Sequence, residues 1–418
     1  MDASFPVMQA DIIPPDRGES IALMEPLLVP SGAARRGELL DKILVLAQQS
    51  AGLRRSLPGH LATSLAGLVR SMNCYYSNLI EGHDTHPVDI ERALRQDFSA
   101  DARQRNLQLE ARAHVEVQAW IDAGGLRGRA FTLEGLLELH RQFCERLPGE
   151  LLWTVGDGNQ AEERVRVQPG TLRTRDVRVG RHVAVSPGAV PRFLHRFVQA
   201  YSGLGKADTI LAAACAHHRL LWIHPFLDGN GRVARLLSHA VLLESLDTGA
   251  LWSVARGLAR NVEAYKRHLA ACDLPRQGDT DGRGSLSQAA LVEFVAFFLD
   301  ICLDQVAFME RLIQPEQLRT RIALWAEECI RLGQLPHHAM AVLEALLYRG
   351  ELPRSDVPTV TGLGDRQARR VVAALQDQGV VISESSRAPL RLAFPARLAP
   401  RWMPGLFPEF PDAPGGQE

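Results

Sequence analysis

Residues 223–235 read Ile-His-Pro-Phe-Leu-Asp-Gly-Asn-Gly-Arg-Val-Ala-Arg, and this stretch decides the fold. A helical pattern precedes it and another follows it. Pro225 disfavours the helical conformation at His224, so we expect the first helix to end there. Gly229 and Gly231 allow the backbone of the short loop to approach a ligand closely. Because the second helix begins near Gly231, its free N–H groups point into the loop, and the geometry predicts an anion site.

The side chains of this stretch add the groups that phosphate chemistry requires. Arg232 and Arg235 are three residues apart and can flank the same anion. Asp228 beside a phosphate chain suits Mg²⁺, which takes one or two carboxylates together with phosphate oxygens and water. His224 is the only strong base at the rim of the loop. The pattern indicates a site that holds a triphosphate with a metal ion and takes a proton from an attacking hydroxyl.

Two other interpretations of the same stretch fit its residues less well. A nucleotide P-loop is excluded because the Gly-Lys-Ser/Thr sequence is absent. A plain helix–loop–helix corner would make His224 a satisfied polar residue and the arginines surface charges. The assembly of a base, a metal ligand, an anion loop and two arginines within thirteen residues favours the functional interpretation.

Composition limits the class of protein. A chain of 418 residues predicts about two or three domains. Its hydrophobic share of 46% and net charge of -1 exclude a largely disordered chain and a globally basic nucleic-acid binder. The six cysteines lack paired spacing, which favours buried thiols over disulfides or a zinc site. No apolar run is long enough for a membrane span and no secretory signal is visible, so we expect a soluble, cytoplasmic protein.

Hydrophobic periodicity predicts a mostly helical chain. Among the expected helices are His60 to Ile80, Thr132 to Glu145 with Thr132 as N-cap, Val190 to Tyr201 and Arg260 to Ala271. The Gly- and Pro-rich segment 148–188 contains a predicted hairpin, Val177 to Val185, that turns at Gly180-Arg181. The expected parts are an extended N-terminal arm (1–35), an N-terminal helical region (36–105), an all-α core (106–312), a linker helix (313–335), a compact module (336–396) and a Pro-rich tail (397–418).

The module at 336–396 has its own pattern. We expect a helix at 338–348, a short element at 352–357, a helix at 365–378 capped by Asp365, and two short strands within 380–394. This order of elements predicts a winged helix-turn-helix. Residues 336–400 hold eight basic and six acidic side chains. Since strong DNA binders carry a denser basic patch, the sequence favours protein docking over DNA binding.

The stretch from His224 to Arg235 resembles the signature of Fic-domain proteins, His-Pro-Phe-x-Asp-Gly-Asn-Gly-Arg-x-x-Arg, at every specified position. Residues 169–180 resemble the flap hairpin of that family. Residues 278–284 and the helix at 291–299 resemble the bacterial branch whose members carry a C-terminal winged helix. The resemblance covers about residues 30–400 of the chain. It implies an all-α Fic core with a small β-hairpin flap, an N-terminal helical region and a C-terminal winged helix-turn-helix.

The resemblance also implies an activity: protein AMPylation, the transfer of AMP from ATP to a Ser, Thr or Tyr hydroxyl of a target protein. It implies that His224 is the catalytic base and that Asp228 holds Mg²⁺. Arg232 would assist at the phosphates and Arg235 would bind the γ-phosphate. The cradle of the α- and β-phosphates would be formed by the backbone of Gly229, Asn230 and Gly231 and by the Asn230 side chain. Tyr265 is a candidate for the adenine pocket, and a core aromatic is the alternative.

Two further features follow from the resemblance. Ser77-Asn78-Leu79-Ile80-Glu81-Gly82 resembles the family's inhibitory motif, in which the glutamate pairs with the second arginine, here Arg235. The inhibitory residues would be Ser77, Glu81 and Gly82. The exposed edge of the flap could receive a strand of the target protein, with Val177, Arg178, Val179 and Gly180 as docking residues.

Other activities remain open from the sequence. The same scaffold could remove AMP or transfer another phosphate-linked group. A nucleotide-sensing winged-helix transcription regulator is a candidate from another class. The target protein, self-modification and formation of a homodimer are not determined by the residue pattern.

Overall fold

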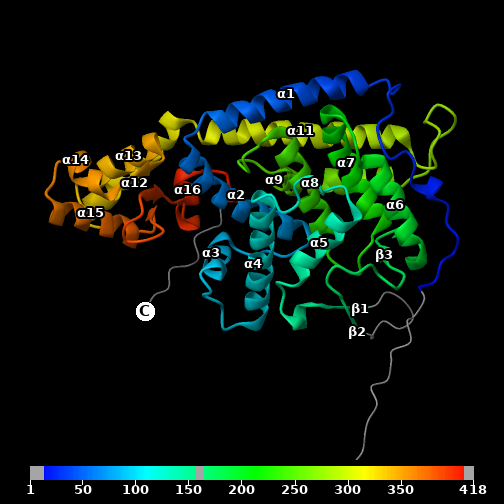
Figure 1. Cartoon of the computed structure of the whole chain (residues 1–418), viewed down its shortest axis with the longest axis horizontal. Coiled ribbons are helices and arrows are strands. Elements are labelled where there is room, and N and C mark those ends of the chain that lie inside the picture. The colour runs from blue at the N-terminus through cyan, green and yellow to red at the C-terminus, as the bar shows by residue number, and fades with distance from the viewer. Residues whose placement is uncertain (1–13, 156–163, 409–418) are drawn as a thin grey trace, which may run out of the picture. The chain divides into compact units, whose positions relative to one another are not determined.

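The computed structural model describes residues 14–155 and 164–408, and most of them lie in helices (Figure 1). The chain divides into two compact units. Unit 1 contains residues 1–36, 128–238 and 267–295, and unit 2 contains residues 37–127, 239–266 and 296–418. The expected arm and tail both extend into residues 1–13 and 409–418, which lie outside the described part of the chain.

The helices follow the predicted order. They are α1 (Arg36–Arg55), α2 (Gly59–Ile80), α3 (Pro87–Leu94), α4 (Ala102–Asp122), α5 (Leu133–Cys144), α6 (Val190–Tyr201), α7 (Lys206–Ile223), α8 (Asn230–Leu246), α9 (Val254–Arg260), α10 (Val262–Cys272), α11 (Gln288–Leu312), α12 (Pro315–Arg331), α13 (Ala339–Arg349), α14 (Val357–Thr361), α15 (Asp365–Asp377) and α16 (Ala399–Trp402).

The strands are short and antiparallel. They are β1 (Trp153–Val155), β2 (Arg164–Arg166), β3 (Arg178–Val179), β4 (His182–Val183), β5 (Glu351–Leu352), β6 (Val381–Ile382) and β7 (Leu390–Leu392). β1 pairs with β2, β3 pairs with β4, and the third sheet has the order β5-β7-β6. In the β3–β4 pair Arg178 lies opposite Val183, which confirms the predicted hairpin with its turn at Gly180.

Unit 1 is built around α6 and α7. The apolar stripe of α6 buries Phe193, Phe197 and Tyr201, which follow each other at a spacing of four residues. Helix α7 is buried over nearly its whole length from Ile210 to Ile223. A helix that is apolar all round lies inside a domain, so α7 is the central element of this unit and carries the candidate loop at its end.

The described part of the N-terminal arm packs along unit 1. Leu27 is buried, and its carbonyl accepts a hydrogen bond of 2.7 Å from the Tyr201 hydroxyl. The Pro26 carbonyl accepts from the Arg219 guanidinium at 2.9 and 3.1 Å. A Cβ at Gly284 would lie 2.3 Å from the Glu25 carbonyl oxygen, so only glycine permits this close approach. The arm is therefore a packed layer of unit 1.

Unit 2 has α2 at its centre, in contact with α4 and α9. Polar side chains inside it bond to each other. The Asn73 amide donates to Gln118 Oε1 at 2.5 Å, the Ser253 hydroxyl donates to Asn73 Oδ1, and Trp252 Nε1 donates to Ser50 Oγ at 3.0 Å. Buried polar groups that are paired in this way fix the relative register of the helices.

The C-terminal part of unit 2 contains α13, α14 and α15, drawn in orange in Figure 1, and the sheet β5-β7-β6. Helix, helix, helix and then two strands is the order that the sequence predicts. The expected second element differs, because residues 351–352 form β5 and the helix α14 begins only at Val357. Asp365 is also not the N-cap of α15: Gly364 occupies that position without a side-chain bond.

Two other expectations are corrected. An extended conformation is the wrong expectation for residues 397–407 of the Pro-rich tail, since Trp402, Met403 and Leu406 are buried. Trp402 packs edge-on against Trp325, with ring centroids 5.1 Å apart. The apolar side chains of the tail, rather than its prolines, decide the conformation. The helix expected from Arg260 to Ala271 is α10, which begins only at Val262, because Asn261 is the C-cap of α9, a short helix that was not expected.

Other local predictions are confirmed. Thr132 is the N-cap of α5, and its side chain accepts from the Gly135 N–H at 3.0 Å. The six cysteines are free and buried. Among the described residues, none of the helices combines the length and the apolar character needed to cross a bilayer.

Candidate active-site loop

The candidate loop begins where α7 ends. His224 is the C-cap of α7 and adopts the left-handed conformation, with φ of 51° and ψ of 61°, while its N–H still bonds to the Leu220 carbonyl at 2.9 Å. A residue with a Cβ rarely adopts this conformation, which costs about 1–2 kcal/mol. Pro225 cannot continue a helix, so the chain turns here. The turn separates the His224 side chain from the side chains of the helix.

The hydrogen bond of His224 determines its tautomer. Its Nδ1 lies 3.2 Å from the Leu221 carbonyl oxygen, which can only accept, so Nδ1 carries the proton. In the neutral imidazole the lone pair then lies on Nε2. The half-buried His224 is therefore prepared to accept a proton at Nε2.

Asn230 closes the loop. Its Oδ1 accepts from the Phe226 N–H at 3.0 Å, and its Nδ2 donates to the Phe226 carbonyl at 2.9 Å. Asn230 is 2% exposed. The resemblance implies that this side chain cradles phosphate; in the structure its carbonyl and amide bond to the Phe226 backbone and shape the loop. Gly229 has φ of +82°, a conformation that favours glycine.

The loop leads into the N-terminus of α8. The first N–H groups of a helix have no partner within the helix, so α8 offers donors and the positive end of its dipole at Asn230 and Gly231. Arg232 and Arg235 are 8% and 3% exposed, and the Arg232 guanidinium lies 5.3 Å from the centroid of the Phe143 ring. Asp228 is exposed at the tip of the loop and accepts the Gly229 N–H at 2.6 Å.

Asp228 is the metal ligand that the sequence predicts. Within residues 14–155 and 164–408, no group of three or more His, Cys, Asp and Glu side chains could hold a metal ion. Asp228 would therefore act with at most one other such side chain of the described residues. Its exposed carboxylate beside an anion-binding helix end fits Mg²⁺, which keeps water and phosphate oxygens in its coordination shell.

Arg173 holds the loop from the side, a role that sequence reasoning missed. Its Nε donates to the His224 carbonyl at 2.7 Å, its Nη1 donates to the Arg175 carbonyl at 2.9 Å, and its Nη2 donates to the Val185 carbonyl. Its backbone N–H bonds to the Pro225 carbonyl at 3.0 Å. Burial lowers the pKa of this guanidinium to about 10, so it remains charged at neutral pH. Arg173 thus joins the end of α7 to both sides of the β3–β4 hairpin.

His140 also supports the loop, and the sequence did not indicate this role. Its ring stacks on Phe226 with centroids 3.9 Å apart and an interplanar angle of 3°. The Gly170 N–H donates to His140 Nδ1 at 2.9 Å, so the ring proton is on Nε2. Burial lowers the pKa of His140 to about 4 and keeps it neutral. Its position was not visible in the sequence because nothing near residue 140 marks it as a partner of residue 226.

The β3–β4 hairpin is the predicted flap. Val179 is 47% exposed and Val183 is 63% exposed, so the hairpin offers apolar side chains to the solvent. Arg178 and Gly180 are exposed as well, whereas Val177 is half-buried. The His182 imidazole bonds to the Trp222 carbonyl at 2.7 Å. This bond ties the hairpin to the last turn of α7, next to the candidate base.

The other predicted residues lie in unit 2. Ser77 is buried in α2, Glu81 is the exposed C-cap of that helix, and Gly82 follows with φ of +84°. The predicted helix end is therefore confirmed. Tyr265 lies in α10 and is 3% exposed. The roles proposed for these residues depend on the function of the chain.

Comparison with known proteins finds a family model that matches the segment containing the loop. Residues 130–242 match the model of the Fic/DOC family and include the whole stretch from His224 to Arg235. The chain is similar to the protein adenylyltransferase Fic of Drosophila ananassae, with 25% identity over 245 residues that cover 57% of this chain and 44% of that one. It is also 27% identical over 173 residues to the protein of the same name from Drosophila grimshawi, covering 41% of this chain and 32% of that one. The chain thus spans less than half the length of these relatives.

The chain also matches solved structures, each with a TM-score below 0.5. A Fic family protein from Desulfovibrio desulfuricans G20 has 18% sequence identity and a TM-score of 0.49, and the match covers 85% of this chain and 96% of that chain. A Fic domain containing signaling protein from Bacteroides thetaiotaomicron VPI-5482 has 20% identity and a TM-score of 0.48, with 64% and 95% covered. The resemblance noted in the sequence is thus confirmed at the level of a Fic/DOC domain within residues 130–242.

Proposed function

We propose that this chain is a protein adenylyltransferase, which transfers AMP from ATP to a Ser, Thr or Tyr hydroxyl of a target protein. The observation that carries the proposal is the His224 imidazole, whose Nδ1 proton is donated to the Leu221 carbonyl and whose Nε2 can accept a proton. The Fic/DOC match of residues 130–242 and the names of the Drosophila relatives support the same class of reaction.

In the proposed reaction the oxygen of the target hydroxyl attacks the α-phosphorus of ATP. The new bond joins that oxygen to phosphorus, the bond from the α-phosphorus to the bridging oxygen breaks, and pyrophosphate leaves. The hydroxyl proton passes to His224 Nε2. Such transfers depend on alignment and on neutralised phosphate oxygens more than on covalent chemistry, and the rigid loop between Pro225 and Asn230 supplies alignment.

The phosphates would be held by groups of the loop and of α8. The N–H groups at the start of α8 would bind the α- and β-phosphates, and Arg232 and Arg235 would add charge-assisted bonds, with Arg235 toward the γ-phosphate. Asp228 would hold Mg²⁺, which neutralises phosphate charge when bound.

Glu81 is the proposed inhibitor of this reaction, together with Ser77 and Gly82. Its position as the exposed C-cap of α2 supports this role, since a carboxylate at a helix end can reach a guanidinium of another segment. If Glu81 pairs with Arg235, the γ-phosphate loses its contact. One charge-assisted hydrogen bond is worth about 1.5–3 kcal/mol, so its removal would raise productive ATP binding roughly tenfold to a hundredfold.

Two surfaces are proposed to bind protein. The exposed edge of the flap would align a strand of the target with His224. Residues 336–396 would act as a winged helix-turn-helix that docks proteins, which the three helices and the sheet β5-β7-β6 support.

The experiment uses the purified full chain with Mg²⁺ and ATP, and intact-mass spectrometry of the chain and of added lysate proteins. Glu81→Ala is expected to raise the fraction of self-modified chain by about tenfold or more, and Glu327→Ala, an exposed helical glutamate, is the matched control. His224→Ala should abolish the modification, whereas His195→Ala, an exposed histidine of α6, should retain it. An added mass other than AMP, or no added mass in Glu81→Ala while ATP is bound, would refute adenylylation and favour another group transfer or nucleotide sensing.

A further inference from the structure

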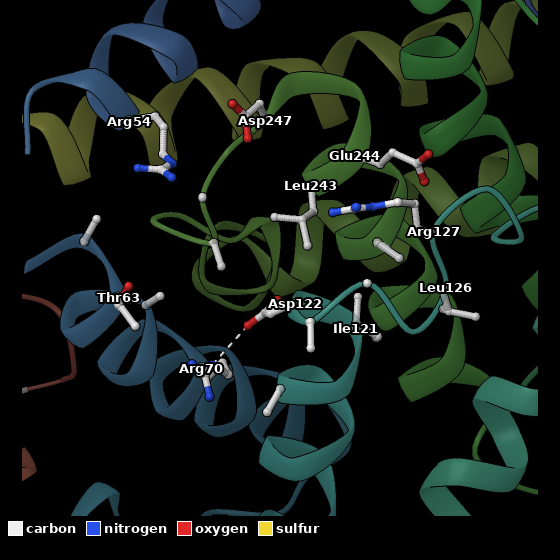
Figure 2. A pocket seen from close by; sticks show the side chains of 18 of the residues that line it. Arg54, Thr63, Arg70, Ile121, Asp122, Leu126, Arg127, Leu243, Glu244 and Asp247 are labelled. Carbon is white, nitrogen blue, oxygen red and sulfur yellow. Dashed lines mark ion pairs between the residues drawn. The ribbon is translucent and has the colours of Figure 1, made fainter. Parts of the chain in front are cut away.

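A cavity of about 640 Å³ opens within unit 2 (Figure 2). Its walls come from the end of α1, the first half of α2, the end of α4 with the turn that follows, and residues 240–250. Cavities of this volume are typical of small-molecule sites. In Figure 2 the Arg54 and Arg127 side chains extend from different sides toward the space.

Arg54 is an incompletely satisfied donor in this cavity. Its Nε is buried and has no hydrogen-bond partner within the described part of the chain. A buried donor without an acceptor costs about 1–3 kcal/mol, so such a group indicates a missing acceptor. Arg54 also lines the cavity, so the remainder of its guanidinium group is the part that a ligand there can meet.

Gly249 keeps Arg54 in this position. A Cβ at Gly249 would lie 2.3 Å from Arg54 Cδ and 2.6 Å from its Nε, and Gly249 has φ of +59°. Its neighbours Asp247 and Ala250 also have positive φ, 47° and 56°, although they carry a Cβ. Three left-handed residues within four positions are a strained connection, and strain of this kind is found at binding and catalytic sites.

The floor of the cavity carries a carboxylate that is already engaged. Asp122 Oδ1 lies 2.7 Å from His239 Nε2, and Asp122 Oδ2 lies 3.0 Å from Arg70 Nε. Figure 2 draws the second contact as a dashed line. Asp122 is therefore paired with His239 and with Arg70, and not with Arg54.

The mouth of the cavity is charged and the walls are apolar. Arg127, Glu244 and Asp247 are exposed. Ala62, Ala66, Leu126 and Leu243 form apolar parts of the lining. The buried polar donors of the cavity thus belong to guanidinium groups, while two of its carboxylates lie in solvent.

We propose that this cavity binds a small molecule that carries a phosphate or carboxylate group on an apolar body. The anion would pair with the guanidinium groups of Arg54 and Arg127, and the apolar body would lie against Leu243 and its neighbours. Guanidinium groups bind both kinds of anion through two parallel hydrogen bonds, and burial strengthens such bonds.

The test measures binding to the purified full chain by isothermal titration calorimetry. The probes are phenyl phosphate, benzoate and the neutral analogue benzamide. We expect saturable binding of one of the two anions and no saturable binding of benzamide. Arg54→Gln should raise the Kd of that anion at least about tenfold, because a charge-assisted bond is lost. The adjacent Arg55→Gln, whose residue does not line the cavity, should leave the Kd unchanged.

A second variant guards against an indirect effect. Gly249→Ala would displace Arg54 without changing any charge and should weaken the same probe, with melting temperatures recorded for each variant. Binding of the anions that is equal in wild type, Arg54→Gln and Gly249→Ala would overturn the proposal and assign the binding to another site, such as the loop at residues 224–235. Saturable binding of benzamide, or no binding of either anion, would also overturn it.

Discussion

Arg173 provides the sharpest test of how the loop is held. We expect Arg173→Gln to release both the end of α7 and the β3–β4 hairpin, because one guanidinium joins the carbonyls of His224, Arg175 and Val185. Glutamine carries no charge and cannot reach three carbonyls from one planar group. Arg181→Gln is the control, since Arg181 is exposed at the turn of the same hairpin.

The size of the effect follows from two opposing contributions. Each hydrogen bond to a charged group contributes about 1.5–3 kcal/mol. Burial opposes them, and the lowered pKa of Arg173, about 10, corresponds to about 3 kcal/mol against the charged form. Three such bonds less this penalty give about 1.5–6 kcal/mol, and we expect a net loss near the middle of that range, about 2–4 kcal/mol, in the free energy of opening this region.

Hydrogen exchange followed by mass spectrometry measures this opening directly. Peptides that contain residues 173–186 and 220–226 should exchange roughly 30- to 1000-fold faster in Arg173→Gln, whereas peptides from α13 should not change. The reasoning is refuted if both loop peptides exchange at the same rate in Arg173→Gln and Arg181→Gln. This outcome does not depend on the proposed activity, since no substrate is present.

Three other predictions concern stability. Burial lowers the pKa of His140, His217 and His218 in unit 1 to about 3–4. A histidine of the unfolded chain has a pKa of about 6.5, so the unfolded chain takes up protons first as the pH falls. The free energy of unfolding, measured by urea titration, should therefore decrease between about pH 6.5 and 4. Substitution of any one by asparagine should reduce this slope. Asn230→Ala should cost about 2 kcal/mol in chemical unfolding, because two bonds to the Phe226 backbone are lost. Trp402→Ala should cost about 3–5 kcal/mol, whereas Trp153→Ala, with 48% of the residue exposed, should cost under about 0.5 kcal/mol; equal losses would contradict the buried position of Trp402.

Local signals in the sequence were sufficient for most of the helices. The end of α2 at Ile80 follows from Gly82, and the N-cap of α5 follows from Thr132, because capping depends on residues within one turn. Helix α9 was not predicted. It has only seven residues, from Val254 to Arg260, and such a short segment shows no clear helical period.

The tail shows the limit of composition. Its prolines predict an extended segment, yet Trp402, Met403 and Leu406 are buried. Burial of a large apolar side chain contributes more than the local preference of a proline, and Pro400 is compatible with the first turn of α16. Whether an apolar residue finds a partner depends on distant segments, such as Trp325 here.

The candidate loop likewise contains features that the sequence predicts and contacts that it does not. Its signature pointed to candidate ligand-binding residues, but two groups that hold the loop come from positions about fifty to ninety residues earlier: Arg173 bonds to the His224 carbonyl, and His140 stacks on Phe226. No spacing rule connects residues so far apart in the chain. Only a three-dimensional arrangement reveals them.

These contacts also change what the signature itself means. The Phe226 ring stacks on His140, and the Phe226 backbone bonds to the Asn230 side chain. Two residues of the signature, Phe226 and Asn230, therefore contribute to the shape of the loop. A loop that is closed before a ligand arrives needs no reordering when it binds one, and the entropy of that ordering is already spent in folding. The affinity of the loop for phosphate should then depend on Asn230 and His140 as well as on the arginines, although neither side chain need touch the ligand.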